Sequence, residues 1–573
     1  MNLLPSKGPS VQHLALAAVK SGAATDDIQV LASLGNFGRN ENHVAGQITS
    51  RFCKNDSLDL PVPYCFEAPV LKKGTDSWYL ANQTLAVFLP HEWFCWVEHH
   101  DNVSGFSGLQ SFWDEHDAAD PKLCKNPMKG SRHLYLPLVI HGDGGQFQKW
   151  DSITIISMRS LLSADNVASS QMLLAAIPKG CQHKSENPDE DTMTVVWKVL
   201  AWSFQHLYYG KFPEFDHLGK PWPAKTKRAD QSGSHLWTQR VRGCLFCVTA
   251  DGEFLQNELK LPGHSHNSCC FSCQANKSDI PHNDFRATAK WRSTLTKPGT
   301  PLPGGHPLGA VPGLNTFSVH YDTLHCLEEG VAAHALANTF FDLVVRGHAG
   351  AGTQDQNLQA VYRQIRQQYL EQGIDASHRI KKLSLTNFSA REKKYEKFPD
   401  LTGFKAKQIR YLAPVMAEIL QFYTDEDDAY SLHRLQCLQN LNSMYELMDC
   451  GLHMGKESIL QFKKVTDLCL LHFARCAKLA MAMEAGLLQW NLIHKHHLVA
   501  HMPAQAAYLN PKLVSTYSGE TMVGFMASLA HACLNGSPPH LVPEKVLWRF
   551  RLGMWLKYIH GSETLESESS SGE

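Results

Sequence analysis

The chain has 573 residues, of which 43% are hydrophobic and 19% charged, and its formal net charge is −1. This composition predicts a chain that folds around a buried core, and it excludes a protein held to nucleic acid by overall charge. The 16 cysteines follow no recognisable secretory leader. No apolar run reaches the roughly 18 residues that cross a bilayer. We therefore expect reduced thiols and no membrane partner.

The first 130 residues predict a mixed α/β extension. Two short helical segments, VQHLALAAVKSG and DDIQVLASLG, lie within the first 50 residues. Residues 51–130 are rich in aromatic residues and proline, and they contain no helix-turn-helix or zinc-finger spacing. We therefore expect no familiar nucleic-acid-binding module in residues 1–130.

A block of predicted strands follows, beginning at His133. The continuous apolar run HLYLPLVI is typical of a central strand that is covered on both faces. Further strands are predicted at 152–157 and 172–177, a helix at 192–210, and a fourth strand at 243–249. Strand, strand, strand, helix, strand is the order of the ribonuclease H fold. We therefore predict an α/β fold with a ribonuclease H-like core whose first part spans residues 131–345.

Long helical segments come next. Between residues 346 and 490 the apolar residues recur at three- and four-residue steps, which predicts a large all-helical insertion into the core. Residues 491–560 are expected to complete the core with a helix that carries a catalytic glutamate. The acidic, serine-rich residues 561–573 are expected to be disordered.

Three acids occupy positions suited to metal-dependent phosphodiester chemistry. Asp143 follows the first predicted strand, where the glycines of the HGDGG run would let the backbone turn tightly beside a ligand. Asp251 follows the fourth predicted strand, and Glu520 lies in a later helical stretch. The first and fourth strands of a ribonuclease H-like sheet are neighbours, so the two aspartates are expected to meet. Such chemistry needs carboxylates that converge on two divalent ions about 3.5–4 Å apart.

Each acid also has a simpler interpretation. An aspartate in a glycine-rich run is commonly only a turn residue, Asp251 in ADGE equally fits a hairpin, and Glu520 fits a helix-start acid. Asp322, which follows the shorter apolar stretch FSVHY, is an alternative second acid. The joint placement of Asp143, Asp251 and Glu520 on the expected elements favours the catalytic interpretation.

The run GCLFCVTADGEFLQNELKLPGHSHNSCCFSCQANKS, followed by HYDTLHCLEEGVAAHALANTF, resembles the catalytic region of eukaryotic cut-and-paste DDE transposases. It looks closest to the CACTA-like and Kyakuja–Dileera–Zisupton groups. Those families place a CxxC after the second catalytic Asp, then a DxxH or CxxH motif, a helical insertion and the catalytic Glu. Here the CxxC is Cys270 and Cys273, and the DxxH is Asp322 and His325. The segment KHHLVAHMPAQAAYLNPKLVSTYSGETMVGFM resembles the region around their last acid, so the resemblance covers roughly 134–536.

The resemblance implies a DNA transposase that cleaves and transfers strands with two Mg²⁺ or Mn²⁺ ions. Its partner would be double-stranded DNA, at element ends and at the target, and the protein would be a nuclear homo-oligomer. The lack of an N-terminal DNA-binding module favours a rival of another class, a degenerate or domesticated copy that only binds DNA or protein. A ribonuclease H-like nuclease of other function is a second alternative.

The CxxC motif has the spacing of half a zinc site. We expect Cys270 and Cys273 to approach His325, with a further histidine completing a tetrahedral Zn²⁺ site. The candidates for that histidine are His264, His266 and His320. Within the DxxH motif, Asp322 is also a candidate metal ligand.

Two other patterns have both a functional and a plain interpretation. His497 and His501 lie four residues apart in HKHHLVAH, and we interpret them as a surface or core pair rather than as metal ligands. A basic segment at 379–410 is the best phosphate-contacting patch of the chain, although such charge runs are commonly only solvated faces. Its candidate DNA-contacting residues are Arg379, Lys381, Lys382, Arg391, Lys393, Lys394 and Lys397.

Overall fold

The computed structural model describes residues 60–554, with gaps at 75–76, 101–107, 120–131, 164–169, 237–240, 298, 303–304, 389–396, 485–486 and 535–537, and a few of the first 30 residues. The expected helical lead-in therefore lies largely outside the described residues, and so does the tail at 561–573. Among the described helices, none is long and apolar enough to cross a bilayer.

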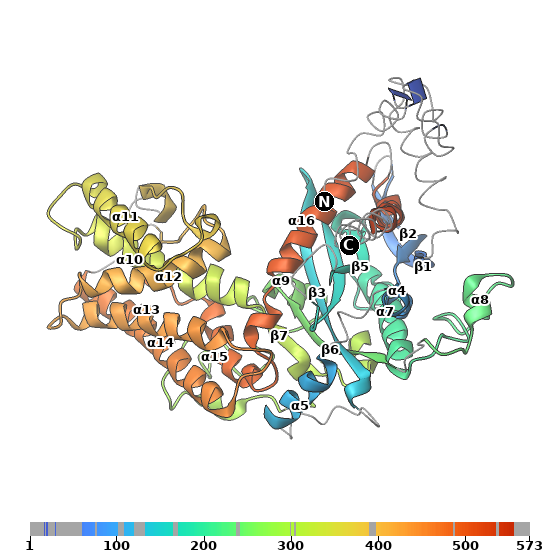
Figure 1. Ribbon diagram of the computed structural model, residues 1–573, viewed down its shortest axis with the longest axis horizontal. Coiled ribbons are helices and arrows are strands. Elements are labelled where there is room, and N and C mark those ends of the chain that lie inside the picture. Colours follow the sequence, from blue (N-terminus) through green and yellow to red (C-terminus); the bar gives the residue numbers. More distant parts are fainter. Residues whose placement is uncertain are drawn as a thin grey trace, which may run out of the picture.

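A five-stranded mixed sheet forms the centre of the right-hand half of Figure 1. Its strands, in the spatial order β5-β4-β3-β6-β7, are Met172–Pro178, Asp151–Ser160, Tyr135–Gln148, Arg242–Ala250 and Val319–Tyr321. β3 and β5 run antiparallel to β4, whereas β3, β6 and β7 are parallel. The α/β class is confirmed. The four predicted strands lie where expected, and the short β7 is an additional strand.

β3 is longer than the sequence predicts. Pairing with β4 continues through the HGDGG run, and Asp143 lies opposite Ile155. The expected turn at Asp143 is therefore wrong, and the glycines of this run have no positive φ. An added Cβ at Gly142 would lie 2.0 Å from the ring of Phe254. These glycines serve the close approach of other elements to the strand.

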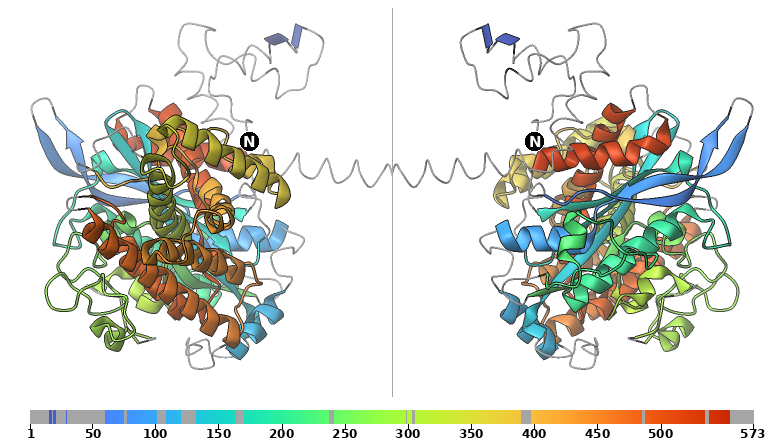
Figure 2. Two further views of the ribbon diagram at one scale, coloured as in Figure 1. Left: turned by 90° about the vertical axis from the view of Figure 1, so that its left-hand side faces the viewer. Right: turned by 90° about the vertical axis from the view of Figure 1, so that its right-hand side faces the viewer.

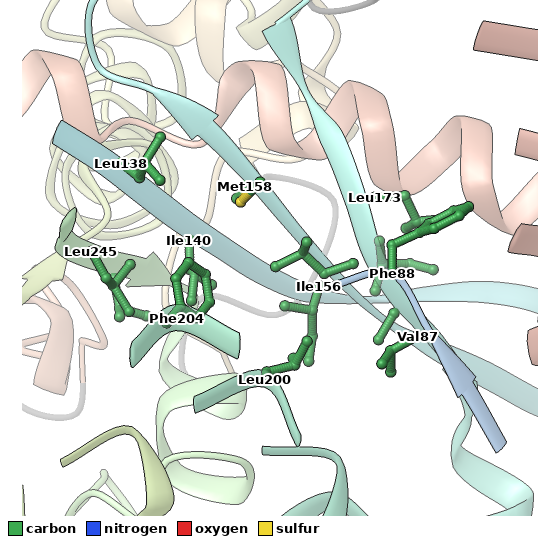
Figure 3. Close-up of a cluster of buried hydrophobic side chains, with 14 of the residues drawn as sticks. Val87, Phe88, Leu138, Ile140, Ile156, Met158, Leu173, Leu200, Phe204 and Leu245 are labelled. Carbon is green, nitrogen blue, oxygen red and sulfur yellow. The ribbon is translucent and has the colours of Figure 1, made fainter. Parts of the chain in front are cut away.

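Helices cover both faces of the sheet. α7 (Thr192–Tyr209) begins at the capping side chain of Asp191 and contacts β6 on one face. From this helix, Leu200 and Phe204 pack toward Ile140 and Ile156 of the sheet (Figure 3). On the opposite face, α16 (Tyr517–Cys533) lies along β3 and β4. This double cover explains why β3 is a continuous apolar run.

A two-stranded hairpin precedes the sheet in the chain. β1 (Tyr64–Lys73) and β2 (Trp78–Val87) are antiparallel over their whole length, and they project from the body of the molecule (Figure 2). The short helices α4 (Pro90–His100) and α5 (Leu109–Ala119) follow the hairpin, whereas α8 (Lys227–Gln231) lies later, between α7 and β6. The predicted mixed extension therefore contains both helix and strand.

The helical part lies to the left of the sheet in Figure 1. It begins after β7 with a continuous helical run in which α10 (Ala333–Phe340) is flanked by the π-helical segments Leu324–Ala332 and Phe341–Val345. The helices that follow are α11 (Gln354–Glu371), α12 (Ala406–Gln421), α13 (Ala429–Met448), α14 (Lys456–Met483) and α15 (His494–Ala506). They share a hydrophobic core separate from that of the sheet.

Candidate active site and metal centre

Three elements bring the predicted acids together. Asp143 lies on β3, and Asp251 is the N-cap of α9 (Gly252–Asn257), where its Oδ1 accepts a hydrogen bond from the Phe254 N–H. Glu520 lies in the first turn of α16. Because β3 and β6 are paired in parallel, the element that carries Asp143 adjoins the one that Asp251 follows.

The acids influence one another directly. Burial, then the charge of Asp143 and a hydrogen bond shared with it, raise the pKa of Glu520 to about 8. Burial also raises the pKa of Asp251, opposed by the Phe254 N–H and assisted by the charge of Asp143. Asp143 is thus the common neighbour of the other two. Its charge adds to the effect of burial in raising the pKa of both neighbouring acids.

His325 stands at the edge of the acid cluster. Its Nδ1 hydrogen-bonds to Oδ2 of Asp322, and its Nε2 lies 3.9 Å from Oε1 of Glu520. Although burial lowers the pKa of His325, Asp322, Glu520 and Asp251 together raise it to about 9. The ring is therefore charged at neutral pH and carries its Nε2–H toward the acids.

Asp322 fixes the position of the His325 ring. Its buried carboxylate accepts hydrogen bonds from the backbone N–H groups of Leu324, His325 and Thr516, at 2.9–3.1 Å, and from the Thr516 hydroxyl at 2.7 Å. These donors, with the ring of His325, occupy both oxygens and lower the pKa of Asp322 in spite of its burial. We therefore keep Asp251 rather than Asp322 as the second acid.

His141, which the sequence analysis passed over, lies beside this cluster on β3. It is 4% exposed, and neither ring nitrogen has a hydrogen-bond partner among the described residues. Burial lowers its pKa to about 4, although Asp143 and Asp322 act in the opposite direction. Its ring is neutral and lies against Gly519 of α16, where an added Cβ would be 2.3 Å from Nδ1.

A second cluster, which we call the Cys/His cluster, consists of Cys270, Cys273, His497 and His501. All four side chains are buried, and one ligand atom of each lies within 4.8 Å of the others. The Sγ–Nε2 distances are 3.4 Å for Cys270–His501 and 3.3 Å for Cys273–His497, and the two Nε2 atoms are 3.1 Å apart. Thiolate and imidazole ligands of one tetrahedral Zn²⁺ lie about 3.3–3.8 Å apart. The cluster could therefore hold a metal ion such as zinc with little movement.

The Cys/His cluster corrects two predictions. His325 is not beside the CxxC motif, because Asp322 and Glu520 hold its ring at the acid cluster. His497 and His501 are not merely a surface or core pair, since they face the two cysteines from α15. The signal was present in the sequence as a CxxC and an i, i+4 histidine pair, but their spatial pairing was not.

The Cys/His cluster joins the two parts of the molecule. Its cysteines lie in the loop after α9, next to β7, where the Tyr321 hydroxyl is 3.7 Å from Sγ of Cys270. Its histidines belong to the helical part, and the buried Trp291 packs edge-on against both rings, with centroids 4.9 and 5.1 Å away. A metal ion here would tie α15 to the edge of the sheet.

The three acids are arranged more openly than the Cys/His cluster. Within the part of the chain that the structure describes, they do not form a group whose ligand atoms all lie within 4.8 Å of one another. Outer ligands of two ions about 3.5–4 Å apart are necessarily farther from each other than ligands of one ion. Among the described residues, the acids therefore do not form a single-ion group of the kind seen in the Cys/His cluster.

The basic segment is only partly described. Lys381, Lys382 and Lys397 are exposed, and Arg379 donates from Nε to the backbone oxygen of Ile374 at 2.7 Å. The other candidate DNA contacts, Arg391, Lys393 and Lys394, lie outside the described residues. The role of this segment in DNA binding stays a prediction.

No protein-family model matches the chain, and no curated protein matches it in sequence. Function must therefore be inferred from the geometry and chemistry of the site itself.

Proposed function

We propose that the chain is a DDE-type DNA nuclease and strand transferase whose catalytic acids are Asp143, Asp251 and Glu520. The observation that carries the proposal is the convergence of these acids from β3, the end of β6 and the first turn of α16. Long stretches of chain separate the three residues. A hydrogen bond links Glu520 to Asp143, and the charge of Asp143 raises the pKa of both Glu520 and Asp251.

The strand order supports a ribonuclease H-like core. In chain order the sheet strands stand 3-2-1-4-5, with the second strand antiparallel to its neighbours and the other pairs parallel. This is the arrangement of the ribonuclease H fold. It places the end of the fourth strand beside the first, where the two aspartates are needed, and the helical part enters between the fifth strand and the helix of the last acid.

The donor set fits divalent cations of the Mg²⁺ or Mn²⁺ type, which prefer carboxylate oxygens and water. Oε1 of Glu520 is buried without a hydrogen-bond partner among the described residues, so an acceptor is left over in the cluster. Bound ions would supply an activated water or 3′-hydroxyl and would stabilise the leaving oxygen. Asp143, Asp251 and Glu520 would hold these ions.

His325 and Asp322 would act beside the acids. The carboxylate of Asp322 fixes the ring, as carboxylates do for histidines around metal sites. The Nε2–H of the charged ring would donate to a phosphate oxygen or to Glu520. In this proposal Asp322 is a positioning residue, because its oxygens are occupied by His325, Leu324 and Thr516.

Cleavage assays on acid variants test the proposal. The substrates are supercoiled plasmid and labelled duplex that carry the genomic DNA flanking the coding sequence, with Mg²⁺ or Mn²⁺. We expect Asp143→Asn, Asp251→Asn and Glu520→Gln each to lower the cleavage rate by about a thousandfold, which corresponds to roughly 4 kcal/mol. DNA binding in EDTA should persist. The matched control is Glu253→Gln, because this nearby carboxylate is 64% exposed and pairs with Lys179.

Two outcomes would count against the proposal. If Glu253→Gln and the three acid variants all cut DNA like the wild type, the acids are not catalytic. Wild-type protein that binds these DNAs but never cuts them would support the rival, a transposase-derived protein that only binds DNA or protein.

A further inference from the structure

The outer half of the β1–β2 hairpin exposes large aromatic residues. Trp78, Tyr79 and Leu80 are 53%, 49% and 43% exposed, although large apolar residues are usually buried. In the hairpin register Trp78 lies opposite Lys73, and Tyr79 lies opposite Lys72. Because successive residues of a strand point to opposite faces, the two lysine–aromatic pairs lie on opposite faces of the ribbon, near the end that projects from the body (Figure 2).

The inner half of the hairpin is firmly anchored. Phe66, Ala68 and Val70 of β1, and Leu85 and Val87 of β2, belong to the core that surrounds the sheet. Val70 also forms an isolated bridge with Gln182, just after the short 3-10 helix Lys179–Cys181. A ribbon with a buried base holds its exposed pairs in a fixed direction, which lowers the entropy lost when a partner binds.

A third lysine–aromatic pair occurs at the β3–β4 turn. Trp150 is 87% exposed, and Nζ of Lys149 lies 4.7 Å from the centre of its ring. The turn lies next to the same 3-10 helix, because the Gly180 N–H donates to Oδ1 of Asp151 at 2.9 Å. Lys179–Cys181 thus contacts both features, so the three pairs share one end of the central sheet.

We infer that this end of the molecule is a binding surface for double-stranded DNA, formed by Lys72, Lys73, Trp78, Tyr79, Lys149 and Trp150. The inference rests on the proposed function and specifies where the duplex leaves the acid cluster. We call these six residues the ribbon surface.

Charge and shape favour a DNA duplex as the partner. Within the described residues, neither Lys72 nor Lys73 forms an ion pair. The nearby acid Glu67 accepts a hydrogen bond from the Thr84 hydroxyl. A two-stranded β-ribbon fits the major groove, and lysines at its rim would meet the phosphates. The exposed rings would pack on sugars and base edges.

β3 runs from the acid cluster toward the β3–β4 turn, which carries Lys149 and Trp150. Asp143 and Gln148, the last residue of β3, are five residues apart on an extended strand. At about 3.3 Å per residue this is roughly 17 Å, which matches about five base pairs at 3.4 Å each. A duplex with its scissile phosphate at Asp143 would therefore reach the β3–β4 turn, with Lys149 and Trp150, within half a helical turn.

DNA binding by purified full-length protein tests the inference. The probe is a fluorescein-labelled duplex of about 30 base pairs, titrated in EDTA at several KCl concentrations. We expect Lys72→Gln with Lys73→Gln to weaken binding several-fold. The slope of log K against log[KCl] should become smaller by about 2, since two phosphate contacts at about 0.9 each are lost. Trp78→Ser with Tyr79→Ser, and Trp150→Ser, should weaken binding while leaving the slope nearly unchanged.

The control is a matched pair of changes on the helical part. Lys456 is exposed at the start of α14 and Phe422 is 78% exposed, so Lys456→Gln with Phe422→Ser should leave binding unchanged. Lys72 is half-buried and its Nζ donates to Oε1 of Gln83 at 3.3 Å, whereas the other substituted side chains are exposed. Equal melting temperatures will show that the fold is intact. Unchanged affinity and slope in the ribbon variants would overturn the inference. So would a change confined to the sedimentation behaviour of the protein, which would mark the ribbon as a contact between copies.

The readouts keep this inference apart from the catalytic proposal. Binding in EDTA needs no cleavage, so the ribbon variants should have the same effect in an Asp143→Asn background. If the wild type cuts DNA but the ribbon variants bind normally, only the ribbon surface is wrong. If the wild type binds through the ribbon but never cuts, only the catalytic proposal fails.

Discussion

A buried glutamate beside the acid cluster links proton binding to stability. Glu328 is fully buried in the π-helical segment Leu324–Ala332, three residues after His325. Burial raises its pKa to about 8, although the charge of Arg410 acts in the opposite direction. The native state therefore keeps a proton on Glu328 at pH values where the unfolded chain, with a pKa near 4.5, has lost it.

The difference in proton binding between the native and unfolded states sets the direction in which stability changes with pH. The unfolded chain binds fewer protons than the native state between about pH 4.5 and 8, so Glu328 makes the protein less stable as the pH rises through this window. Glu328→Gln removes the titration. We expect the variant to match the wild type near pH 4.5 and to exceed it at pH 8 by about 1–3 kcal/mol.

Thermal melting of both proteins across pH 4.5–8.5 measures this effect. The control is Glu329→Gln, because the neighbouring Glu329 is exposed. A melting-temperature difference between Glu328→Gln and the wild type that does not grow with pH would contradict the prediction.

At the residue scale, the sequence indicated which acids were candidates for a site but not which residues they would contact. Asp251 and Glu520 could be selected because each stands at an element boundary, and Asp143 because it follows the predicted strand, although β3 continues past it. Their catalytic role stays a prediction. The sequence could not predict that Asp322 positions His325, because two of the hydrogen bonds that Asp322 accepts come from Thr516, far away in the chain. Nothing in the local sequence signals that a carboxylate will be saturated by such a distant segment.

At the element scale, the position of α16 depends on glycines. An added Cβ at Gly519 would lie 2.3 Å from the buried ring of His141. On β3, an added Cβ at Gly145 would lie 3.0 Å from both Val523 and Ala527 of α16. The helix that carries Glu520 can therefore lie against the strand that carries Asp143 only where both surfaces lack side chains.

Two glycines of the same helix allow a matched test. Gly519→Ala forces overpacking, which costs about 1–3 kcal/mol and outweighs the 0.5–1 kcal/mol that alanine contributes to a helix. At Gly524 an added Cβ meets nothing within 4 Å. We expect Gly519→Ala to lower the melting temperature and Gly524→Ala to raise it slightly. Equal shifts in the two variants would show that the close approach at Gly519 is unimportant.

The elements themselves were largely predictable, because apolar periodicity reports burial. The HGDGG run was not, since glycine in a sequence signals a turn far more often than a crowded strand. β7 was not predicted either. It has only three residues and pairs with β6 alone, so it carries too little pattern to be recognised.

At the scale of the whole molecule, the sheet and the helical part have separate cores, and the Cys/His cluster spans the boundary. We expect the purified protein to contain about one Zn²⁺ per chain. Removal of the metal should lower the melting temperature, because a structural zinc contributes its binding free energy to the folded state.

Cysteine variants separate the metal ligands from ordinary buried thiols. Cys270→Ser should lose zinc and melt at a lower temperature. The control is Cys269→Ser, because the adjacent buried thiol lies outside the cluster and points to the Ala275 oxygen, 3.7 Å away. Metal analysis of both variants decides the matter, and full zinc content in Cys270→Ser would contradict the assignment.

The sequence could not predict that the two cysteines of this cluster pair with the histidines of α15. Most of the helical part separates the CxxC at Cys270 from the histidines of α15. Several other histidines lie closer to the CxxC in the sequence and were equally plausible ligands. Only the docking of α15 against the sheet edge selects His497 and His501.

The late arrival of α16 has a consequence for protein synthesis. The chain between Asp143 and Glu520 is more than half of the molecule. At about 5–20 residues per second, the ribosome needs tens of seconds to travel between the two codons. During this interval the face of β3 and β4 that α16 later covers has no permanent neighbour, and a nascent chain has two of the three acids at most. A product released before residue 517 would lack α16 and Glu520, so under the proposed function the order of the chain delays the assembly of the acid cluster until α16 has been made.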